Sequence, residues 1–346
     1  MPGDVRAPEK ASLHKPPIFI VGPPRSGTTL TARILGQHSR IFMPGETHFF
    51  DDIYSRREEM GDPENPEARA TIIQRLATLY ARYNELPDQR RIVTLFSEPR
   101  VLEELQSALD YKTLLSSFMN IQTRYVGKAR WGNNVPKDIF SVREILGFYP
   151  QAKILICVRD VRDFLVSYRD KWRLASPQGK DRLKKLYHPL VTSLLWKSSV
   201  KQIAVVETLG QPENVMTVRY ESLVEDPKTV VRQICDFIEE DFEEAMLDVR
   251  THNSSTQVDK EGIFPSSVGR WRQQLTNEEI FIAQQIAGRE LQRFGYERAV
   301  VDVHFGKLFF LCATAPYACA KALAANRKMS GPLLPYLLRR CTTLFG

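Results

Sequence analysis

The chain has 346 residues, of which 43% are hydrophobic and 26% are charged. These fractions are typical of a globular protein of one large or two small domains, and they exclude a disordered chain or a fibre. Lys and Arg number 48 against 41 Asp and Glu, which gives a net charge of +7. The excess favours an anionic partner, such as a nucleotide or an acidic membrane surface. Because the sequence contains no strongly basic array, we expect no nucleic-acid partner.

The five cysteines form no CxxC pair and lie far apart in the sequence. This spacing argues against a zinc site and against a disulfide framework, so we expect no metal and a reducing compartment. Residues 1–16 are polar and contain prolines but no apolar signal core, and we expect them to be flexible. A cytoplasmic location follows as an expectation.

Apolar periodicity predicts the framework of the fold. Three apolar, β-rich runs predict buried strands of a parallel sheet, at residues 17–22, 152–158 and 215–218. The same analysis predicts helices at residues 27–36, 161–173, 181–209 and 227–239. This alternation of strands and helices predicts an α/β protein with three layers, α/β/α, around a mainly parallel central sheet.

The last part of the chain differs in charge from the rest. Residues 303–346 contain no Asp or Glu but keep six basic residues, Lys307, Lys321, Arg327, Lys328, Arg339 and Arg340. The uncharged run 308–320 is shorter than the roughly 20 residues that a membrane span needs, and Pro316 interrupts it. We therefore expect residues 301–346 to form a basic, apolar extension that does not cross a bilayer.

Residues Gly22 to Thr29, with the sequence GPPRSGTT, lie where the first predicted strand meets the first helix. Backbone N–H groups and a helix N-terminus at such a turn form a binding site for phosphate. The spacing matches the nucleotide-binding loop GxxxxGK[ST], except that Thr28 replaces the lysine that reaches the β- and γ-phosphates. This difference argues against a kinase, while an ordinary glycine-containing turn is the alternative.

The run from Pro23 to Thr29 resembles the PxRSGTT loop of the sulfotransferases that use 3′-phosphoadenosine 5′-phosphosulfate (PAPS). The resemblance implies a P-loop-like fold in which Arg25 contacts the sulfate. It also implies that the loop holds the 5′-phosphate. The implied nucleotide-binding positions of the loop are Pro24, Arg25, Ser26, Gly27, Thr28 and Thr29.

A second motif, Arg159 at the end of a predicted strand with Ser167 in the following helix, resembles the 3′-phosphate site of this family. A guanidinium and a hydroxyl both suit a phosphate, because one supplies charge with forked donors and the other a further hydrogen bond. A solvated helix N-terminus capped by Asp160 or Asp163 is the alternative.

Three residues further along the chain resemble nucleotide contacts of the family. Tyr220 lies in a segment similar to RYExL, whose tyrosine borders the adenine nucleotide, although a core aromatic is an equal alternative. Ser254 and Arg270 lie in segments that resemble the C-terminal loop over the 3′-phosphate in tyrosylprotein and bacterial sulfotransferases. A polar loop that ends in a packed tryptophan is the alternative there.

A hydroxyl acceptor loses a proton as sulfur is transferred, so the reaction needs a base. Glu46 lies in a segment that resembles the GEE motif of tyrosylprotein sulfotransferases and the KExHFF motif of heparan sulfate sulfotransferases, where the glutamate is the general base. His48 is a further candidate polar group, with a structural histidine as the alternative. Lys137 resembles the lysine of NKxP or EKxP segments and is expected to neutralise charge on the transferred group.

The resemblance covers about residues 18–271 and implies a PAPS-dependent sulfotransferase domain over residues 17–300, with 3′,5′-bisphosphoadenosine (PAP) as product and no metal. Residues 51–135 are expected to form a helical insertion on the acceptor side. The acceptor, a small molecule, glycan, lipid or peptide with a hydroxyl group, is left open, as is the oligomeric state. A degenerate P-loop kinase and a non-catalytic PAP-binding protein are the alternatives. Peripheral membrane contact through the C-terminal extension is a separate hypothesis, against packing on the domain or at an oligomer interface.

Overall fold

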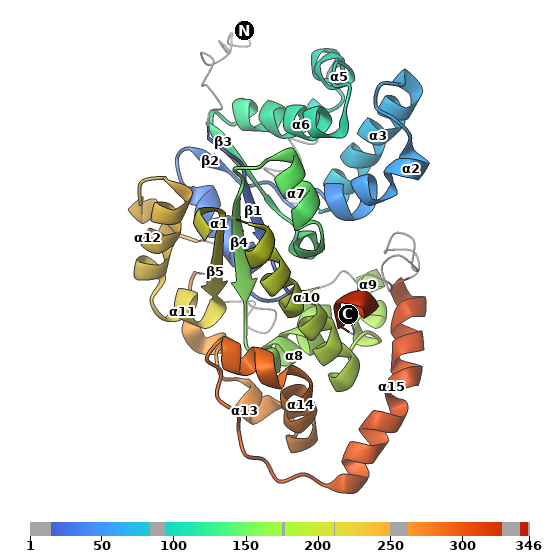
Figure 1. The fold of residues 1–346 in the computed structure, drawn as a ribbon, viewed down its shortest axis with the longest axis vertical. Coiled ribbons are helices and arrows are strands. Elements are labelled where there is room, and N and C mark those ends of the chain that lie inside the picture. Colours follow the sequence, from blue (N-terminus) through green and yellow to red (C-terminus); the bar gives the residue numbers. More distant parts are fainter. Residues whose placement is uncertain are drawn as a thin grey trace.

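The computed structural model describes residues 15–83, 94–174, 177–210, 212–249, 262–326 and 340–344, so most of the predicted N-terminal segment 1–16 lies outside the described residues. The strands form one parallel sheet with the order β2-β3-β1-β4-β5 (Figure 1). The strands are β1 (Ile18–Val21), β2 (Ile41–Phe42), β3 (Arg130–Asn134), β4 (Lys153–Val158) and β5 (Val215–Arg219). The three predicted strands correspond to β1, β4 and β5.

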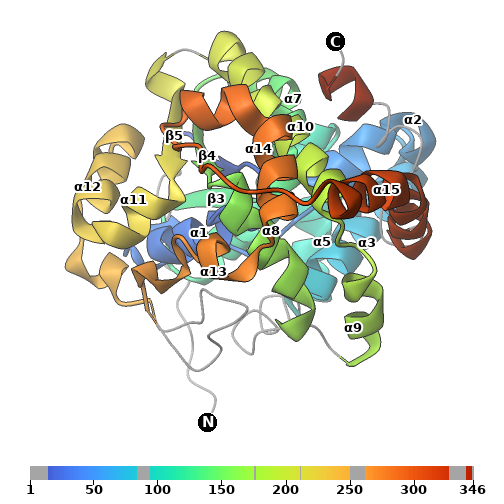
Figure 2. The ribbon, with the colours of Figure 1, turned by 90° about the horizontal axis from the view of Figure 1, so that it is seen from below.

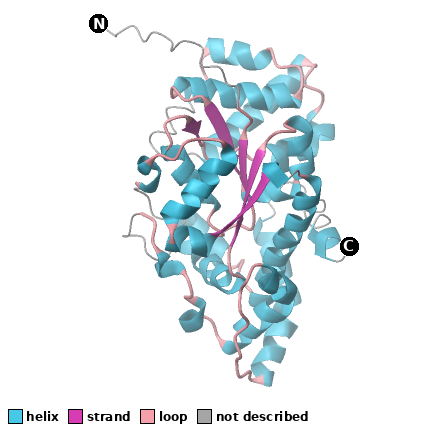
Figure 3. Cartoon of the chain, turned by 60° about the vertical axis from the view of Figure 1, so that its left-hand side comes forward, coloured by secondary structure: helices cyan, strands magenta, loops and turns pink. Residues whose placement is uncertain are grey.

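Side chains of β1 alternate between two hydrophobic clusters, because successive residues of a strand point to opposite faces of the sheet. Ile18 and Ile20 belong to one cluster, and Phe19 and Val21 belong to the other. Helices cover both faces, so the sheet is the middle layer of three, as Figure 3 shows. The predicted three-layer α/β/α fold is confirmed.

Each helical layer is built from a few amphipathic segments. One layer consists of α1 (Thr28–Gln37), α11 (Tyr220–Glu225) and α12 (Pro227–Ile238). The opposite layer contains α7 (Val142–Phe148), α8 (Val161–Arg169), α10 (Pro189–Leu209) and α14 (Asn277–Arg293). In Figure 2 these two groups lie on opposite sides of the strands. The other helices are α2 (Arg57–Met60), α3 (Pro66–Tyr83), α5 (Pro99–Gln106), α6 (Tyr111–Tyr125), α9 (Pro177–Lys184), α13 (Trp271–Gln274) and α15 (Phe305–Asn326).

Two elements differ from the sequence-based expectation. The helix predicted for residues 181–209 is two helices, because Pro189 begins α10 and cannot continue α9. The stretch 51–135, expected to be helical, includes β3, which lies next to β1 within the sheet. The acceptor-side role of this stretch remains a prediction, and its helices α3, α5 and α6 gather beyond the end of the sheet at which β4 begins (Figure 1).

The expectation that Pro316 interrupts the C-terminal apolar segment is wrong. Helix α15 has 22 residues and continues through Pro316. A proline removes one hydrogen bond and kinks a helix but need not end it. Residues Phe305–Ala325 are long and apolar enough to cross a membrane by length and composition, which corrects the expected shortness of this segment. Helix α15 packs against α10 at the edge of the molecule in Figures 1 and 2.

Candidate functional site

The candidate residues follow the carboxyl ends of neighbouring strands. The phosphate loop begins at Gly22 directly after β1, Arg159 directly follows β4, and Tyr220 directly follows β5. Lys137 comes three residues after β3. Because the carboxyl ends of parallel strands meet at one edge, the sheet brings these residues to the side where α/β proteins bind their ligands.

Two glycines fix the path of the loop. Gly22 has a φ of 139°, and a Cβ there would lie 2.3 Å from the carbonyl oxygen of Cys157. Gly27 has a φ of 95°, and a Cβ there would lie 2.6 Å from Cδ2 of Tyr220. Both positions therefore require glycine, for conformation and for space. The loop can then approach β4 and β5 closely.

The loop presents polar groups without a partner in the described part of the protein. Helix α1 starts at Thr28 with no side-chain cap at Gly27 and no acidic residue in its first turn. The hydroxyl of Ser26 is buried and finds no hydrogen-bond partner among the described residues. Pro24 is half-buried, and Thr29 is exposed. A helix N-terminus with uncapped N–H groups and a buried, unused hydroxyl fits a phosphate group.

Arg25 joins the loop to the second motif. It has a φ of 67°, and its Nε donates a hydrogen bond of 3.1 Å to Oγ of Ser167 in α8. Arg159 donates through Nη1 to the carbonyl oxygen of Arg25 at 3.5 Å. The structure thus places Ser167 against Arg25, whereas the sequence placed it beside Arg159, and the three residues lie together at the loop.

The cations near the loop repel one another. Burial and the neighbouring charge of Arg159 lower the pKa of Arg25, with Tyr220 acting weakly in the opposite direction. Burial, Arg25 and Arg182 lower the pKa of Lys171 to about 6. The Nε of Arg159 is also buried without a hydrogen-bond partner in the described part of the chain. A polyanion would relieve this repulsion, so the residues present fit a nucleotide with several phosphate groups.

The segment around Arg270 is anchored to α8 by a buried carboxylate. Asp163 accepts hydrogen bonds from the backbone N–H groups of Gly269 and Trp271, at 2.6 and 3.0 Å. Asp160 is the N-cap of α8. The alternative interpretation of the motif had named Asp160 or Asp163 as this cap. Arg270 is half-buried and donates to Gln274 at 3.1 Å. Ser254 lies outside the described residues.

Tyr220 has a packed position between the two motifs. Its ring is buried, lies 4.2 Å from the guanidinium carbon of Arg159, and faces Gly27. Its hydroxyl shares a hydrogen bond with Ser267, whose carbonyl oxygen accepts from Nη2 of Arg159 at 2.6 Å. The tyrosine therefore supports the arginine and the loop together, as a core aromatic would, and its contact with the adenine nucleotide remains a prediction.

The acid–base candidates form a chain of alternating charges. Oε2 of Glu46 lies 2.9 Å from Nε2 of His48, and Nδ1 of His48 lies 2.9 Å from Oδ1 of Asp51. The other oxygen of Asp51 lies 3.4 Å from Nζ of Lys137. Pro136, next to Lys137, accepts a hydrogen bond from the backbone N–H of Gly22 at 3.2 Å. The structure therefore joins Glu46, His48 and Lys137 to the start of the phosphate loop.

The two carboxylates hold His48 in its charged form. Burial lowers the pKa of His48, but the hydrogen bonds and charges of Asp51 and Glu46 outweigh it and raise the pKa to about 11. Burial raises the pKa of Asp51, but His48 and Lys137 hold it below its usual value. His48 therefore carries a proton on both ring nitrogens: Nδ1 donates to Asp51, and Nε2 forms an ion pair with Glu46.

The sequence analysis missed two members of the site. Asp51 follows His48 by three residues on a helical turn, so its spacing was a usable signal. Lys171 lies four residues after Ser167, but only the fold shows its interaction with Arg25.

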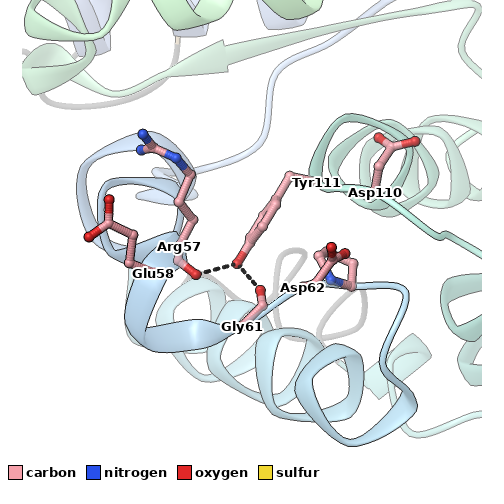
Figure 4. Close-up of a pocket in the computed structure, with 7 residues that line it drawn as sticks. Arg57, Glu58, Gly61, Asp62, Asp110 and Tyr111 are labelled. Carbon is pink, nitrogen blue, oxygen red and sulfur yellow. Dashed lines mark hydrogen bonds between the residues drawn. The ribbon is translucent and has the colours of Figure 1, made fainter.

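A separate hollow of about 390 Å³ between residues 57–63 and 110–111 lies outside the site. The hydroxyl of Tyr111 in this hollow already donates to the carbonyl of Gly61 (Figure 4).

Comparison with known proteins identifies the family. The model of the sulfotransferase family matches residues 16–244, more than half of the chain. The chain belongs to the sulfotransferase family. A relative from Aquifex aeolicus (strain VF5), described as an uncharacterized protein, is 28% identical over 276 residues, which is 75% of this chain and 30% of the relative. The 3-beta-hydroxysteroid sulfotransferase of Cavia porcellus is 26% identical over 130 residues, which is 36% of this chain and 42% of that enzyme. The chain thus spans less than half the length of these two relatives.

Two solved structures show the same fold. The sulfotransferase domain from the curacin biosynthetic pathway has a TM-score of 0.54 at 20% identity, and the match covers 82% of this chain and 99% of that one. The sulfotransferase domain of the Synechococcus PCC 7002 olefin synthase has a TM-score of 0.51 at 22% identity, covering 85% and 99%. These likenesses confirm the predicted P-loop-like fold.

Proposed function

We propose that this protein transfers the sulfuryl group of PAPS to the hydroxyl group of an acceptor and releases PAP. The observation that carries the proposal is the close approach of Arg159 to Arg25 at the phosphate loop, where Nε of Arg159 and the hydroxyl of Ser26 are buried without a partner among the described residues. A nucleotide with phosphates at both the 3′ and the 5′ position supplies the anions that this group requires. The family match over residues 16–244 supports the same reaction class.

Each part of the candidate site has a role in this proposal. The N-terminus of α1, with Ser26, Thr28 and Thr29, binds the 5′-phosphate, and Arg159 with Arg270 binds the 3′-phosphate. The acceptor oxygen attacks sulfur, the bond between sulfur and the phosphate oxygen breaks, and that oxygen leaves with the electron pair on PAP. Arg25 and Lys137 stabilise the charge on the transferred group. The acceptor proton goes to the base.

The geometry favours Glu46 over His48 as that base. A histidine that is protonated on both ring nitrogens has no lone pair with which to take a proton. Glu46 keeps one carboxylate oxygen beyond its contact with His48, and its side chain is 32% exposed, so an acceptor can reach it. His48 then positions Glu46, and Asp51 positions His48 and Lys137.

Replacement of Glu46 by Gln tests the proposal. Loss of a general base lowers turnover by about 10²- to 10⁴-fold, so we expect E46Q to lose sulfuryl transfer by this factor while its affinity for PAP stays unchanged. E58Q, which changes an exposed glutamate of α2, is the matched control and should keep full turnover. Unreduced transfer by E46Q would contradict the role of Glu46.

Two alternatives predict different results in the same assays. A degenerate kinase would turn over magnesium-ATP, for which this loop lacks the usual lysine because Thr28 takes its place. A non-catalytic binding protein would bind PAP tightly and sulfate no acceptor in a broad panel. The paired chain from Glu46 to Lys137 speaks against the second alternative, because a pure binder has no use for a base beside the loop.

A further inference from the structure

An apolar cavity lies between the sulfotransferase domain and the C-terminal extension. Its volume is about 450 Å³, which falls within the range of about 300–1,000 Å³ that small-molecule sites occupy. Helix α10 supplies one wall and α15 the other, and residues 340–344 close one side. The largest aliphatic side chains of the two walls are Leu190, Leu194, Leu195 and Leu323.

Two residues of the cavity wall lead directly to the candidate site. Tyr168 lines the cavity, and the centre of its ring lies 3.3 Å from Nζ of Lys171, whose pKa the charge of Arg25 helps to lower. Arg340 also lines it, and its guanidinium carbon lies 4.8 Å from the ring of Phe140. Phe140 belongs to the same short helical turn, Pro136–Phe140, as Lys137. Two contacts therefore link the cavity wall to residues beside the phosphate loop and beside Lys137.

We propose that this cavity binds the hydrocarbon part of the acceptor, so that the acceptor is an alcohol with a long or bulky apolar body. This proposal rests on the sulfuryl transfer proposed above. The lining offers aliphatic surface with few polar groups, so it gains free energy by taking apolar area out of water and cannot satisfy the many hydroxyls of a glycan. One wall of the cavity lies within the family match, whereas α15 and residues 340–344 lie outside it.

Three cysteines make the cavity accessible to experiment. Cys312, Cys319 and Cys341 all line it, and none of the three is buried. The other two cysteines, Cys157 and Cys235, are buried in the core, and burial raises the pKa of both thiols, so both react slowly. The rate at which a thiol reagent modifies the first three therefore reports occupation of the cavity.

The binding test measures modification by N-ethylmaleimide, followed for each cysteine by mass spectrometry, with 1-decanol as the probe and glycerol as the polar control. We expect 1-decanol to slow modification of Cys319 at least fivefold and glycerol to leave it unchanged. Ala315→Trp fills the cavity and should abolish the protection, whereas Ala320→Trp, on the exposed side of the same helix, should retain it. Equal rates with and without 1-decanol would overturn the proposal.

The transfer test separates this proposal from the proposed function. With radiolabelled PAPS, the native protein should sulfate 1-decanol, and A315W should lose at least tenfold in this activity while it binds PAP as before. If A315W does not fold, Ala322→Phe, a smaller intrusion from the same wall, replaces it. Protection without sulfation of 1-decanol would overturn the acceptor role of the cavity. Failure of the native protein to bind PAP would instead contradict the proposed function.

The outer face of α15 carries a second, independent inference. Phe305, Phe309, Phe310 and Tyr317 are 84%, 75%, 65% and 71% exposed. Helix α15 also carries Lys307 and Lys321 and no acidic residue, so positive charge accompanies these apolar side chains on the same helix. Apolar side chains with adjacent cations match an acidic membrane surface. We propose that α15 attaches the protein to anionic lipid, where apolar alcohols also collect.

Sedimentation with vesicles tests this attachment. The protein should sediment with vesicles of phosphatidylglycerol and much less with vesicles of phosphatidylcholine, and 0.5 M salt should weaken the first interaction. The double variant F309E/F310E should lose at least tenfold in binding, and L109E, which changes an exposed leucine elsewhere, should not. Absence of vesicle binding would overturn the proposal, as would a dimer that F309E/F310E dissociates, because a second copy would then cover this face.

Discussion

The phosphate-loop side and the acid–base side of the site handle charge in opposite ways. At the loop, burial and then the charges of neighbouring cations lower the pKa values of Arg25 and Lys171. On the other side, Glu46, His48, Asp51 and Lys137 alternate in sign, and each charge has its counter-charge within 3.4 Å. One side is incomplete without an anion, while the other is complete in the protein alone.

This difference assigns separate tasks to the two sides. An unbalanced group of cations gains most from a ligand, so the loop side should determine nucleotide affinity. A balanced chain gains little from a charged ligand but holds a carboxylate in a fixed orientation, so the other side should determine the rate of transfer. Variants of the loop side should therefore change binding, and variants of the paired side should change turnover.

The largest effect on nucleotide binding is expected for Arg159→Ala. Charged hydrogen bonds contribute about 1.5–3 kcal/mol each, so loss of this guanidinium should weaken PAP binding by roughly 100-fold. The affinity for 5′-AMP should change much less, because AMP has no 3′-phosphate. Calorimetric titration measures both, and R143A, at an exposed position of α7, is the control. Equal losses for PAP and AMP would remove Arg159 from the 3′-phosphate site.

A smaller effect is expected on the paired side. Asp51→Asn keeps the shape of the side chain but removes the charge that His48 and Lys137 share. We expect kcat to fall about tenfold or more, with unchanged PAP affinity. Because the pKa of His48 would fall from about 11 toward its ordinary value, the rate should also acquire a new titration near neutral pH. D62N, at an exposed residue, is the control, and a flat pH profile in D51N would contradict the positioning role.

The smallest effect concerns protons taken up on binding. Lys171 has its pKa lowered to about 6, so it is mostly neutral in the free protein at pH 7.5. An anion at Arg25 raises that pKa, so binding takes up part of a proton, and PAP affinity should fall as the pH rises above about 6. Calorimetry in buffers of different ionisation enthalpy measures the uptake. K171M should abolish it, K228M should not, and uptake by K171M would assign it to another group.

Sequence reasoning succeeded where the signal is local. The run 17–29 contains a buried strand, a glycine loop and an amphipathic helix in sequence, and the structure has β1, the loop and α1 there. It failed for β3, because the residues Arg130, Asn133 and Asn134 do not look like a buried strand. Arg130 is buried there with distant partners, namely the carbonyl oxygens of Pro16 and Ile238 and the carboxylate of Glu240. Such long-range partners leave no periodic pattern in the sequence.

The residues of the site fall into the same two groups, those that a local motif predicts and those that only the fold brings together. Glu46, Arg25 and Arg159 stand in motifs, so the sequence could propose them. The contact of Ser167 with Arg25 and the interaction of Lys171 with Arg25 depend on how α8 is placed against the loop. The apolar cavity depends on the packing of α15 against α10, which no local pattern encodes.

The central claim is that the phosphate-loop side of the site recognises a nucleotide by its 3′-phosphate. Thermal unfolding of the purified protein tests it, with PAP, 5′-AMP and magnesium-ATP at equal concentrations, because a ligand that binds only the native state raises the Tm. PAP should raise the Tm by several degrees and 5′-AMP by much less, as expected if Arg159 binds the 3′-phosphate. A larger increase with magnesium-ATP than with PAP would contradict the account.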